Sequence, residues 1–266
     1  MKNVLSKASR ELRQILREMP SSLDDVRGMR YGPKLLANSL PKSGTHLLLT
    51  SLSHFPLLRG YRAFHVSMMD APGDTDDIYD KITRVSRGQR VSGHVFHNRR
   101  FVDTLRSEGI KCVFIIRDLR DVAVSSSFYI TKLQNHRLHD YFHSLIDDDE
   151  RLMAVIRGID ASLLPDGMRS KDIGELTRGF LPWMDESYCC AIRFEDLVGP
   201  RGGGSAARQN SAIRRIASYL EIDISQEDLE RIAGSAFSEH SPTFRRGQAR
   251  GWREYFKEKH KQAMKE

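Results

Sequence analysis

The sequence predicts an α/β fold, a single domain with a central, mostly parallel sheet flanked by helices. Short apolar runs of strand length occur without alternating polar residues, as in strands that are covered on both faces. Segments of helical character separate these runs. Residues 34–50 combine a strand, a tight glycine turn and a helix start. The 266 residues suffice for one large domain with a sizeable core.

The composition is that of a soluble protein with excess positive charge. Hydrophobic residues make up 39% and charged residues 29%, and no apolar run approaches the ~20 residues of a membrane span. The net charge of +7 suits nucleic acid, a membrane surface or a small polyanion. The sequence has no zinc spacing, RNA-binding aromatic motif or long basic tract with aromatics. We therefore expect a polyphosphorylated nucleotide, and no nucleic acid, as partner.

The cysteines and the N-terminus indicate a reducing compartment. Cys112, Cys189 and Cys190 all lie in apolar, strand-like runs. Their odd number and the adjacent pair predict reduced core residues rather than a disulfide or zinc framework. The first residues lack the apolar segment of a secretory signal. We expect a cytoplasmic protein.

Residues 1–19 are predicted to form a basic amphipathic helix. Its apolar side chains fall near one face: Val4, Leu5, Ala8, Leu12, Ile15 and Leu16. Such a helix can lie on an anionic membrane, but packing on its own domain is more common and is what we expect. Residues 21–33 are predicted to be a polar connector. We therefore divide the chain into a helix and connector, 1–30, and a domain, 31–266.

The stretch at 34–50 predicts an anion site. After a buried strand, the turn Pro41–Gly44 leads into a helix that begins at Thr45. The first N–H groups of a helix have no partner within it, and the helix dipole adds positive charge. Lys42 adds a full charge, but it precedes Gly44, whereas the nucleotide-triphosphatase loop has G-x-x-x-x-G-K-[ST]. The alternative is an ordinary turn without a ligand.

Two further predicted strands end in polar residues. The strand 90–95 carries His94 and is followed by His97 and a connecting helix at 98–108. Since ligands of open α/β sheets bind at the carboxyl ends of strands, both histidines are candidates, although a lone histidine is more often structural. Residues 56–89 are mixed, with a turn at 71–74, and can supply walls of an acceptor site.

Residues 111–116 form the clearest strand in the chain. The strand ends at the charged run 117–121, and a helix is predicted over 122–130. Arg117 at the strand tip and Ser125 in the helix are both placed to reach an anion at this edge. The alternative is a self-paired, solvated charge cluster.

The second half is predicted to be helical until a late strand. The acidic run 147–150 lacks spaced ligands, so it predicts a helix start and no metal site. The other elements follow in order: helices within 131–182, a strand at 188–194, a flexible Gly-, Ser- and Arg-rich loop at 199–211, and short helices at 212–221 and 225–234.

Three motifs resemble those of sulfotransferases that use PAPS (3′-phosphoadenosine 5′-phosphosulfate), with features of bacterial-type members. PKSGT at 41–45 resembles their 5′-phosphosulfate loop. RDLRDVAVS at 117–125 matches every specified position of their 3′-phosphate motif, R-[DN]-x-[RK]-D-x-x-V-S. FRRGQARGW at 244–252, with Phe256, resembles the segment R-K-G-x-x-G-x-W-x-x-x-F. Arg250-Gly251 departs from the usual Gly-Asp or Gly-Ser, which leaves the hinge geometry of this segment open.

The resemblance implies a P-loop-like architecture shared with nucleotide kinases, PAPS as co-substrate, PAP (3′-phosphoadenosine 5′-phosphate) as product, and no required metal. It assigns the donor-binding residues as Lys42, Ser43, Gly44, Thr45 and His46 for the 5′ side, Arg117, Ser125, Arg245, Arg246 and Gly247 for the 3′-phosphate, and Phe194 near the adenine. Lys42 would also stabilise the bridging oxygen as its bond to sulfur breaks. His94 would be the general base, with His97 the weaker candidate.

The resemblance also implies transfer of a sulfuryl group to an acceptor hydroxyl. We rank a carbohydrate or glycoconjugate acceptor first, with other small molecules after it. Two alternatives stay open: a nucleotide-kinase-like phosphotransferase, and a catalytically silent protein that binds PAPS or PAP. The dimerisation segment K-x-x-x-T-V-x-x-x-E of cytosolic members is not evident, so the sequence does not indicate an oligomeric state.

Overall fold

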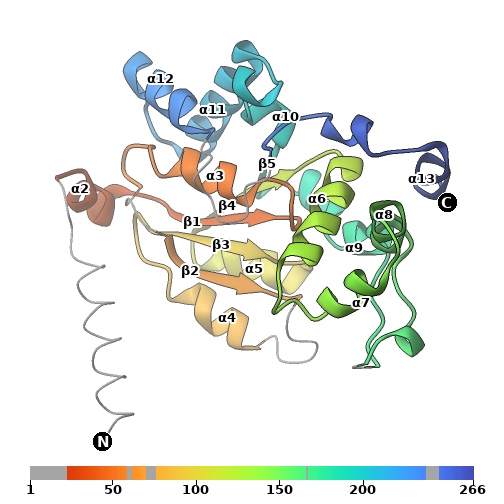
Figure 1. The fold of residues 1–266 in the computed structure, drawn as a ribbon. Helices are drawn as coiled ribbons and strands as arrows, with labels where there is room; N and C mark the ends of the chain where they lie inside the picture. Colours follow the sequence, from red (N-terminus) through yellow and green to blue (C-terminus); the bar gives the residue numbers. More distant parts are fainter. Residues whose placement is uncertain (1–22, 59–61, 70–75, 166, 238–245) are drawn as a thin grey trace, which may run out of the picture.

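The computed structural model describes residues 23–58, 62–69, 76–165, 167–237 and 246–266. Its centre is a five-stranded sheet with the strand order β2-β3-β1-β4-β5, and helices cover both faces (Figure 1). Every neighbouring pair of strands is parallel. The predicted α/β domain with a parallel central sheet is therefore confirmed.

The first strand of the sequence is the central strand of the sheet. The strands are β1 (Lys34–Ser39), β2 (Arg62–Ser67), β3 (Arg90–His94), β4 (Ile110–Ile116) and β5 (Cys190–Arg193). Ala37 of β1 pairs with Ser92 of β3 on one side and with Val113 of β4 on the other. Because all strands run the same way, the residues that follow β1, β3, β4 and β5 meet at one edge of the sheet.

Two hydrophobic cores, one on each face of the sheet, explain the apolar runs without alternation. Leu35 and Val113 face the core beneath α3 (Thr45–Leu52), α10 (Phe194–Leu197), α11 (Ala206–Leu220) and α12 (Gln226–Ser235). Leu36 and Phe114 face the core of the other side, with α4 (Asp76–Thr83), α5 (Arg99–Ser107), α6 (Leu119–Lys132), α8 (Asp148–Arg157) and α9 (Ile173–Arg178). Both sides of a central strand are thus withdrawn from water, and both need apolar side chains.

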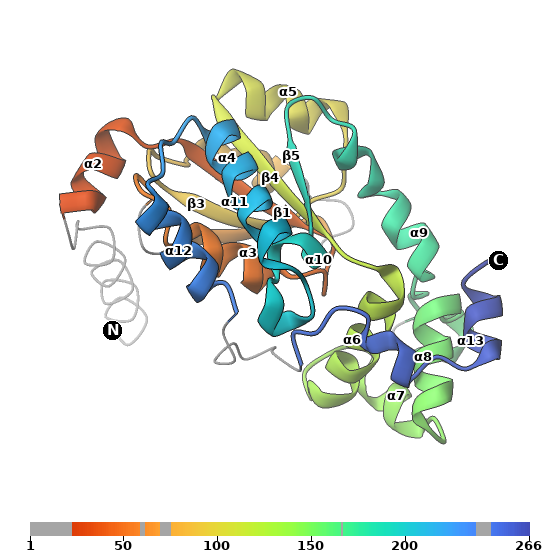
Figure 2. The same cartoon turned by 90° about the horizontal axis from the view of Figure 1, so that it is seen from above.

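Two further helices extend the domain at the carboxyl edge of the sheet. They are α7 (His139–Ser144) and α13 (Glu258–Ala263), with single 3-10 turns at Ala161–Leu163, Leu181–Met184, Pro200–Gly202 and Gly251–Glu254. The C-terminal helix α13 packs beside α8 (Figure 2). The last residues of the chain are therefore brought back past α6, which follows β4.

Three segments differ from the sequence-based expectations. The predicted connector 21–33 contains the helix α2 (Leu23–Tyr31), and the mixed region 56–89 contains β2 and α4. β2 escaped notice because it is an edge strand, which can carry polar side chains such as His65. The loop 199–211 forms a 3-10 turn and the first part of α11, capped by the Ser205 side chain. The predicted helix 1–19 lies outside the described residues.

Candidate active site

The turn between β1 and α3 has a backbone that only a few residues tolerate. Lys42 has φ 65° and Gly44 has φ 108°, both left-handed. A Cβ atom at Gly44 would lie 2.6 Å from Cδ2 of Phe194, so only glycine fits here. Gly44 is also the residue before the first turn of α3. The turn therefore presents the N-terminus of a helix at the carboxyl edge of the sheet, which suits an anion.

The side chains of this turn divide into inward and outward groups. Ser43 is fully buried, and its Oγ donates to the carbonyl oxygens of Leu40 (2.5 Å) and Ile115 (2.9 Å). Its N–H donates to Leu40 as well (3.1 Å). Ser43 thus fastens the turn to β4, and its contact with a phosphate stays a prediction. Lys42 points outward, with Nζ 3.8 Å from the centre of the Tyr129 ring on α6, while His46 is exposed on the first turn of α3.

His94 is the last residue of β3 and lies beside the end of β1. Its Nδ1 is 2.9 Å from the carbonyl oxygen of Ser39 and 3.2 Å from the Ser39 Oγ. A carbonyl can only accept, so Nδ1 carries the proton and the neutral ring keeps its lone pair on Nε2. The same Ser39 Oγ is 2.7 Å from Oγ1 of Thr45. The candidate base and the candidate phosphate turn therefore share one hydrogen-bonded residue.

A second histidine that the sequence did not single out lies against His94. The ring of His65, on β2, has its centre 5.0 Å from that of His94, with the two planes at 73°. Its Nδ1 is 2.7 Å from Oγ of Ser92. Sequence reasoning could have found His65 only by first recognising β2 as a strand. The end of β2 lies beside His94, because Ser67 is paired with His94.

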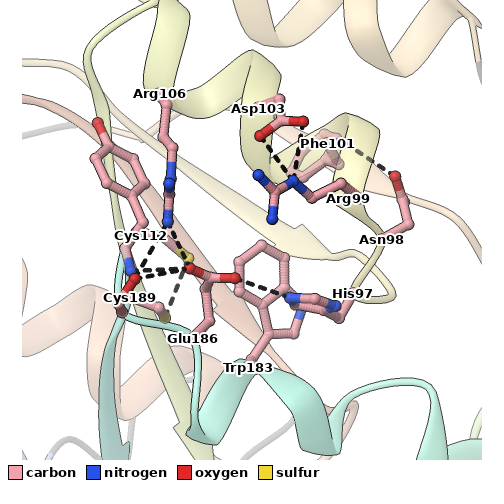
Figure 3. A network of polar contacts seen from close by, with 12 residues as sticks. His97, Asn98, Arg99, Phe101, Asp103, Arg106, Cys112, Trp183, Glu186 and Cys189 are labelled. Carbon is pink, nitrogen blue, oxygen red and sulfur yellow. Dashed lines mark hydrogen bonds and ion pairs between the residues drawn. The ribbon is translucent and has the colours of Figure 1, made fainter.

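His97 belongs to a different group of contacts (Figure 3). Its Nε2 is 3.2 Å from Oε2 of Glu186, and its ring packs edge-on against Trp183 at 5.0 Å between centres. The other oxygen of Glu186 accepts from Nη2 of Arg106 (2.9 Å) and from the Tyr188 N–H (3.0 Å). These contacts of Glu186, called the clasp below, join α5 and the residues just before it to the segment that leads into β5. The Nε2 atom of His97 is thus engaged by Glu186 and its ring by Trp183, and the choice of His94 as the base stays a prediction.

The clasp predicts a pH-dependent part of the stability. The N–H of Tyr188 and the hydrogen bonds from His97 and Arg106 lower the pKa of Glu186 from 4.5 to about 2. A lowered folded-state pKa stabilises the fold above pH 4.5, and the stabilisation is lost as the pH falls from 4.5 towards 2. We expect Glu186→Gln to cost up to about 3 kcal/mol at pH 7 and much less at pH 3. Urea unfolding at both pH values measures this, and an equal cost at both would contradict it.

Arg117 leaves the end of β4 and reaches residues 246–256, called the C-terminal segment below. Its side chain is only 10% exposed, and its guanidinium carbon lies 4.2 Å from the centre of the Phe194 ring. Nη2 donates to the carbonyl oxygen of Gln248 (2.6 Å). Arg117 is thus held in place by residues from the end of the chain and by the start of α10.

Asp121, four residues later, fixes the same segment through two backbone groups. It is 2% exposed, and its two carboxylate oxygens accept from the N–H groups of Arg250 and Trp252, both at 2.8 Å. Its Oδ2 also lies 3.6 Å from Nη2 of Arg117. Asp121 is absent from the residues predicted to form the site, although it is a fixed position of the 117–125 motif. Its buried carboxylate makes the C-terminal segment part of the site.

Only part of the charged run 117–121 is self-paired. Nε and Nη2 of Arg120 donate to the two oxygens of Asp118 at 2.9 and 2.6 Å. Burial alone would raise the pKa of Asp118, but the hydrogen bonds from Arg120 outweigh burial and lower that pKa. The Arg120 guanidinium also lies 3.7 Å from the centre of the Trp252 ring. The pair therefore supports the C-terminal segment from the side of α6.

The glycine-rich turn at 200–204 is a platform for the C-terminal segment, rather than the flexible loop expected. The Gly202 carbonyl accepts from the Ala249 N–H (2.9 Å), and the Gln248 Nε2 donates to the Arg201 carbonyl (2.9 Å). A Cβ atom at Gly202 would lie 2.1 Å from Cγ2 of Val198 and 2.7 Å from the Gly247 carbonyl oxygen. The glycine content thus allows a close approach of two backbones.

This platform predicts opposite outcomes for two glycines. Gly202→Ala is expected to displace the C-terminal segment, costing about 1–3 kcal/mol of stability. Gly234 lies in α12, where an added methyl group would meet no atom within 4 Å, so Gly234→Ala is expected to be neutral or to stabilise by about 0.5–1 kcal/mol. Thermal unfolding of both variants checks this, and equal effects of the two substitutions would contradict the platform.

The backbone of the C-terminal segment shows how it turns at Arg250-Gly251, where the sequence departs from the family pattern. Gly247 has φ 59° and Arg250 has φ 65°, so Arg250, and not Gly251, takes the left-handed conformation. Arg246 is exposed, and its ion pair with Glu254 raises the pKa of its guanidinium. Arg245 lies outside the described residues, so its contact with the 3′-phosphate stays a prediction.

Ser125 and Phe194 complete the predicted donor residues. Ser125 is half-buried on α6, one turn before Tyr129, so it faces the same side as the residue that contacts Lys42. Phe194 is 4% exposed and lies beneath Gly44 and Arg117. Phe194 therefore supports both halves of the site from below, and its contact with an adenine stays a prediction.

Two general properties of the described residues bear on the chemistry. No group of three or more His, Cys, Asp or Glu side chains among them is placed to hold a metal ion. None of the described helices combines the length and the apolar character needed to cross a bilayer.

Solved structures of sulfotransferases have the same fold as this chain. Mouse sulfotransferase SULT7A1 in complex with PAP superposes with a TM-score of 0.60 at 17% identity, over 93% of this chain and 88% of that one. Retinol dehydratase with androsterone and the inactive cofactor PAP gives 0.55 at 17% identity, over 91% and 81%. Retinol dehydratase with retinol and PAP gives 0.54 at 15% identity, over 95% and 84%. No protein-family model and no curated protein matches the sequence.

Proposed function

We propose that this chain is a PAPS-dependent sulfotransferase that moves a sulfuryl group to an acceptor hydroxyl. The observation that carries the proposal is the meeting of two cationic sites at one sheet edge. The Lys42 turn follows β1, and Arg117, tied to the C-terminal segment, follows the neighbouring β4. A nucleotide with phosphates on both its 5′ and 3′ positions fits such a pair of sites. PAP is such a nucleotide, and the structures that share this fold contain it.

On this proposal, the donor lies along the carboxyl edge of the sheet. The helix N-terminus at Thr45 and His46 and the charge of Lys42 bind the 5′-phosphosulfate. Arg117, Ser125 and the segment around Gly247 bind the 3′-phosphate, with Arg245 and Arg246 as further cations. Asp121 binds no ligand here, but it fixes the backbone of Arg250 and Trp252 so that the segment keeps its place.

The reaction is an in-line displacement at sulfur, similar in its needs to phosphoryl transfer. Nε2 of His94 takes the proton of the acceptor hydroxyl, and the acceptor oxygen forms a bond to sulfur as the bond from sulfur to the bridging oxygen breaks. Lys42 stabilises the negative charge that develops on the leaving phosphate. His94 can act in this way because its other nitrogen donates to the Ser39 carbonyl, which fixes the tautomer.

For the acceptor we propose a polar, hydroxyl-rich molecule, with a carbohydrate or glycoconjugate first. The support is the polar character of the residues around the base, where His65, Ser92 and Ser39 are hydrogen-bonded to one another or to His94. Retinol dehydratase is seen with androsterone and retinol, so a less polar small molecule is the second choice. A cytoplasmic location agrees with the three free thiols.

Calorimetry without magnesium tests the donor site. We expect wild-type protein to bind PAP tightly and ATP weakly, because only PAP carries a 3′-phosphate for Arg117. Arg117→Ala should weaken PAP binding by about 2 kcal/mol, roughly 30-fold, since that is the scale of a charge-assisted contact with little exposure. The exposed Arg99→Ala, on α5, serves as the matched control and should leave PAP binding unchanged.

The same titrations separate the alternatives. Equal binding of ATP and PAP, or no effect of Arg117→Ala, would favour a kinase-like phosphotransferase and overturn the 3′-phosphate assignment. Tight PAP binding with no transfer of labelled sulfate to any member of a broad acceptor panel would indicate a silent binding protein.

A further inference from the structure

We infer that His65 is a positioning residue that lowers the pKa of the base His94 and so extends the pH range in which the base is neutral. The inference rests on the proposed function only in calling His94 a base, because the coupling of the two rings is a property of the protein alone. It follows from the ring contact at 5.0 Å and from the bonds that hold each ring in place.

The strand register puts the two rings on one side of the sheet. His65 of β2 is paired with Ser92 of β3, and Ser67 is paired with His94. Residues two apart in a strand point to the same face, so His94 and Ser92 share a face with His65 beside them. The bond from Ser92 to Nδ1 of His65 (2.7 Å) holds the second ring against the first.

The two rings differ in how readily each takes a proton. His65 is exposed, whereas His94 is half-buried and already donates from Nδ1 to the Ser39 carbonyl. Burial disfavours the charged form of a histidine, so the first proton bound by the pair goes to His65. A second positive charge about 5 Å away is then opposed by repulsion, which Coulomb's law puts at about half a pKa unit in water and about two units near a protein surface.

Two hydrogen-bond partners of the rings do not titrate in the pH range of the test. Ser39 of β1, which is bonded to His94, and Ser92 of β3, which is bonded to His65, are not titratable in this range. His65 is the described titratable group whose ring contacts that of His94, and its charge can be changed by substitution.

The test is a titration of the histidine ring signals by NMR on the unliganded full chain. His65→Gln removes the charge and is expected to raise the pKa of His94 by about 0.5 unit or more, and His65→Lys, positive at all relevant pH, is expected to keep it low. Ser92→Ala keeps His65 but removes this hydrogen bond to its ring, and a shift smaller than that of His65→Gln is expected. His143→Gln, an exposed histidine on α7, is the matched control and should leave His94 unchanged.

Two outcomes would overturn the inference. One is a His94 pKa that stays within about 0.2 unit in His65→Gln while the ring signals show a folded protein. The other is an activity of His65→Gln that falls equally at every pH, which a merely structural role would produce. Since the NMR titration needs no substrate, absence of PAP binding by wild-type protein would count against the proposed function and not against the coupling of the rings.

Discussion

His94→Asn is expected to lower kcat by about 10²–10⁴-fold while leaving the affinity for PAP unchanged, because general-base catalysis contributes a factor of this size. Asparagine can still donate to the Ser39 carbonyl, so the local structure is kept. What is lost is the lone pair on Nε2, the atom that faces away from the 2.9 Å bond to Ser39. The measurement is the rate of sulfate transfer from labelled PAPS with PAP binding followed in parallel.

His97→Gln is the matched control for this experiment. His97 contacts Glu186 and Trp183 in the clasp of Figure 3. Its replacement should lower the stability of the fold and leave kcat within a few-fold of wild type. If His97→Gln removed activity while His94→Asn retained it, the assignment of the base would be reversed.

Asp121→Ala is expected to have the second-largest effect, because it affects three groups at once. The substitution leaves the N–H groups of Arg250 and Trp252 without their acceptor and removes the carboxylate that lies 3.6 Å from Arg117. A buried group left unsatisfied costs about 1–3 kcal/mol, and removing one member of a buried charge pair costs about 3–5 kcal/mol. We expect PAP binding to fall by more than about 100-fold and the free energy of unfolding to fall by about 3 kcal/mol or more.

Two variants make the Asp121 result specific. Asp121→Asn keeps one carbonyl oxygen as an acceptor. It should therefore lose less PAP affinity and less free energy of unfolding than Asp121→Ala. The exposed Asp223→Asn, between α11 and α12, removes a charge of the same sign without such contacts and should change neither. PAP affinity that survives Asp121→Ala would mean that the C-terminal segment does not depend on this carboxylate.

The sequence determined the parts of the fold that depend on local patterns. The strands at Lys34–Ser39, Arg90–His94 and Ile110–Ile116 were predicted within a residue or two. For the first and the third the signal was an apolar run, which a strand buried on both faces needs. The helix start at Asp147, which caps α8 through its side chain, followed from its acidic residues. β2 did not, since an edge strand needs no such run.

The sequence also predicted which segments make up the candidate site, because its turn and its two motifs depend on residues close together in the chain, and the roles of their residues stay predictions. Only the tertiary structure decided how these pieces meet. Asp121 gained its place from backbone groups about 130 residues away, and Gly202 and Gly203 from the close approach of residues 247–249. His65 lies beside His94 only because β2 pairs with β3. A contact between segments that are distant in the chain depends on packing and on strand order, and no local pattern of residues records either.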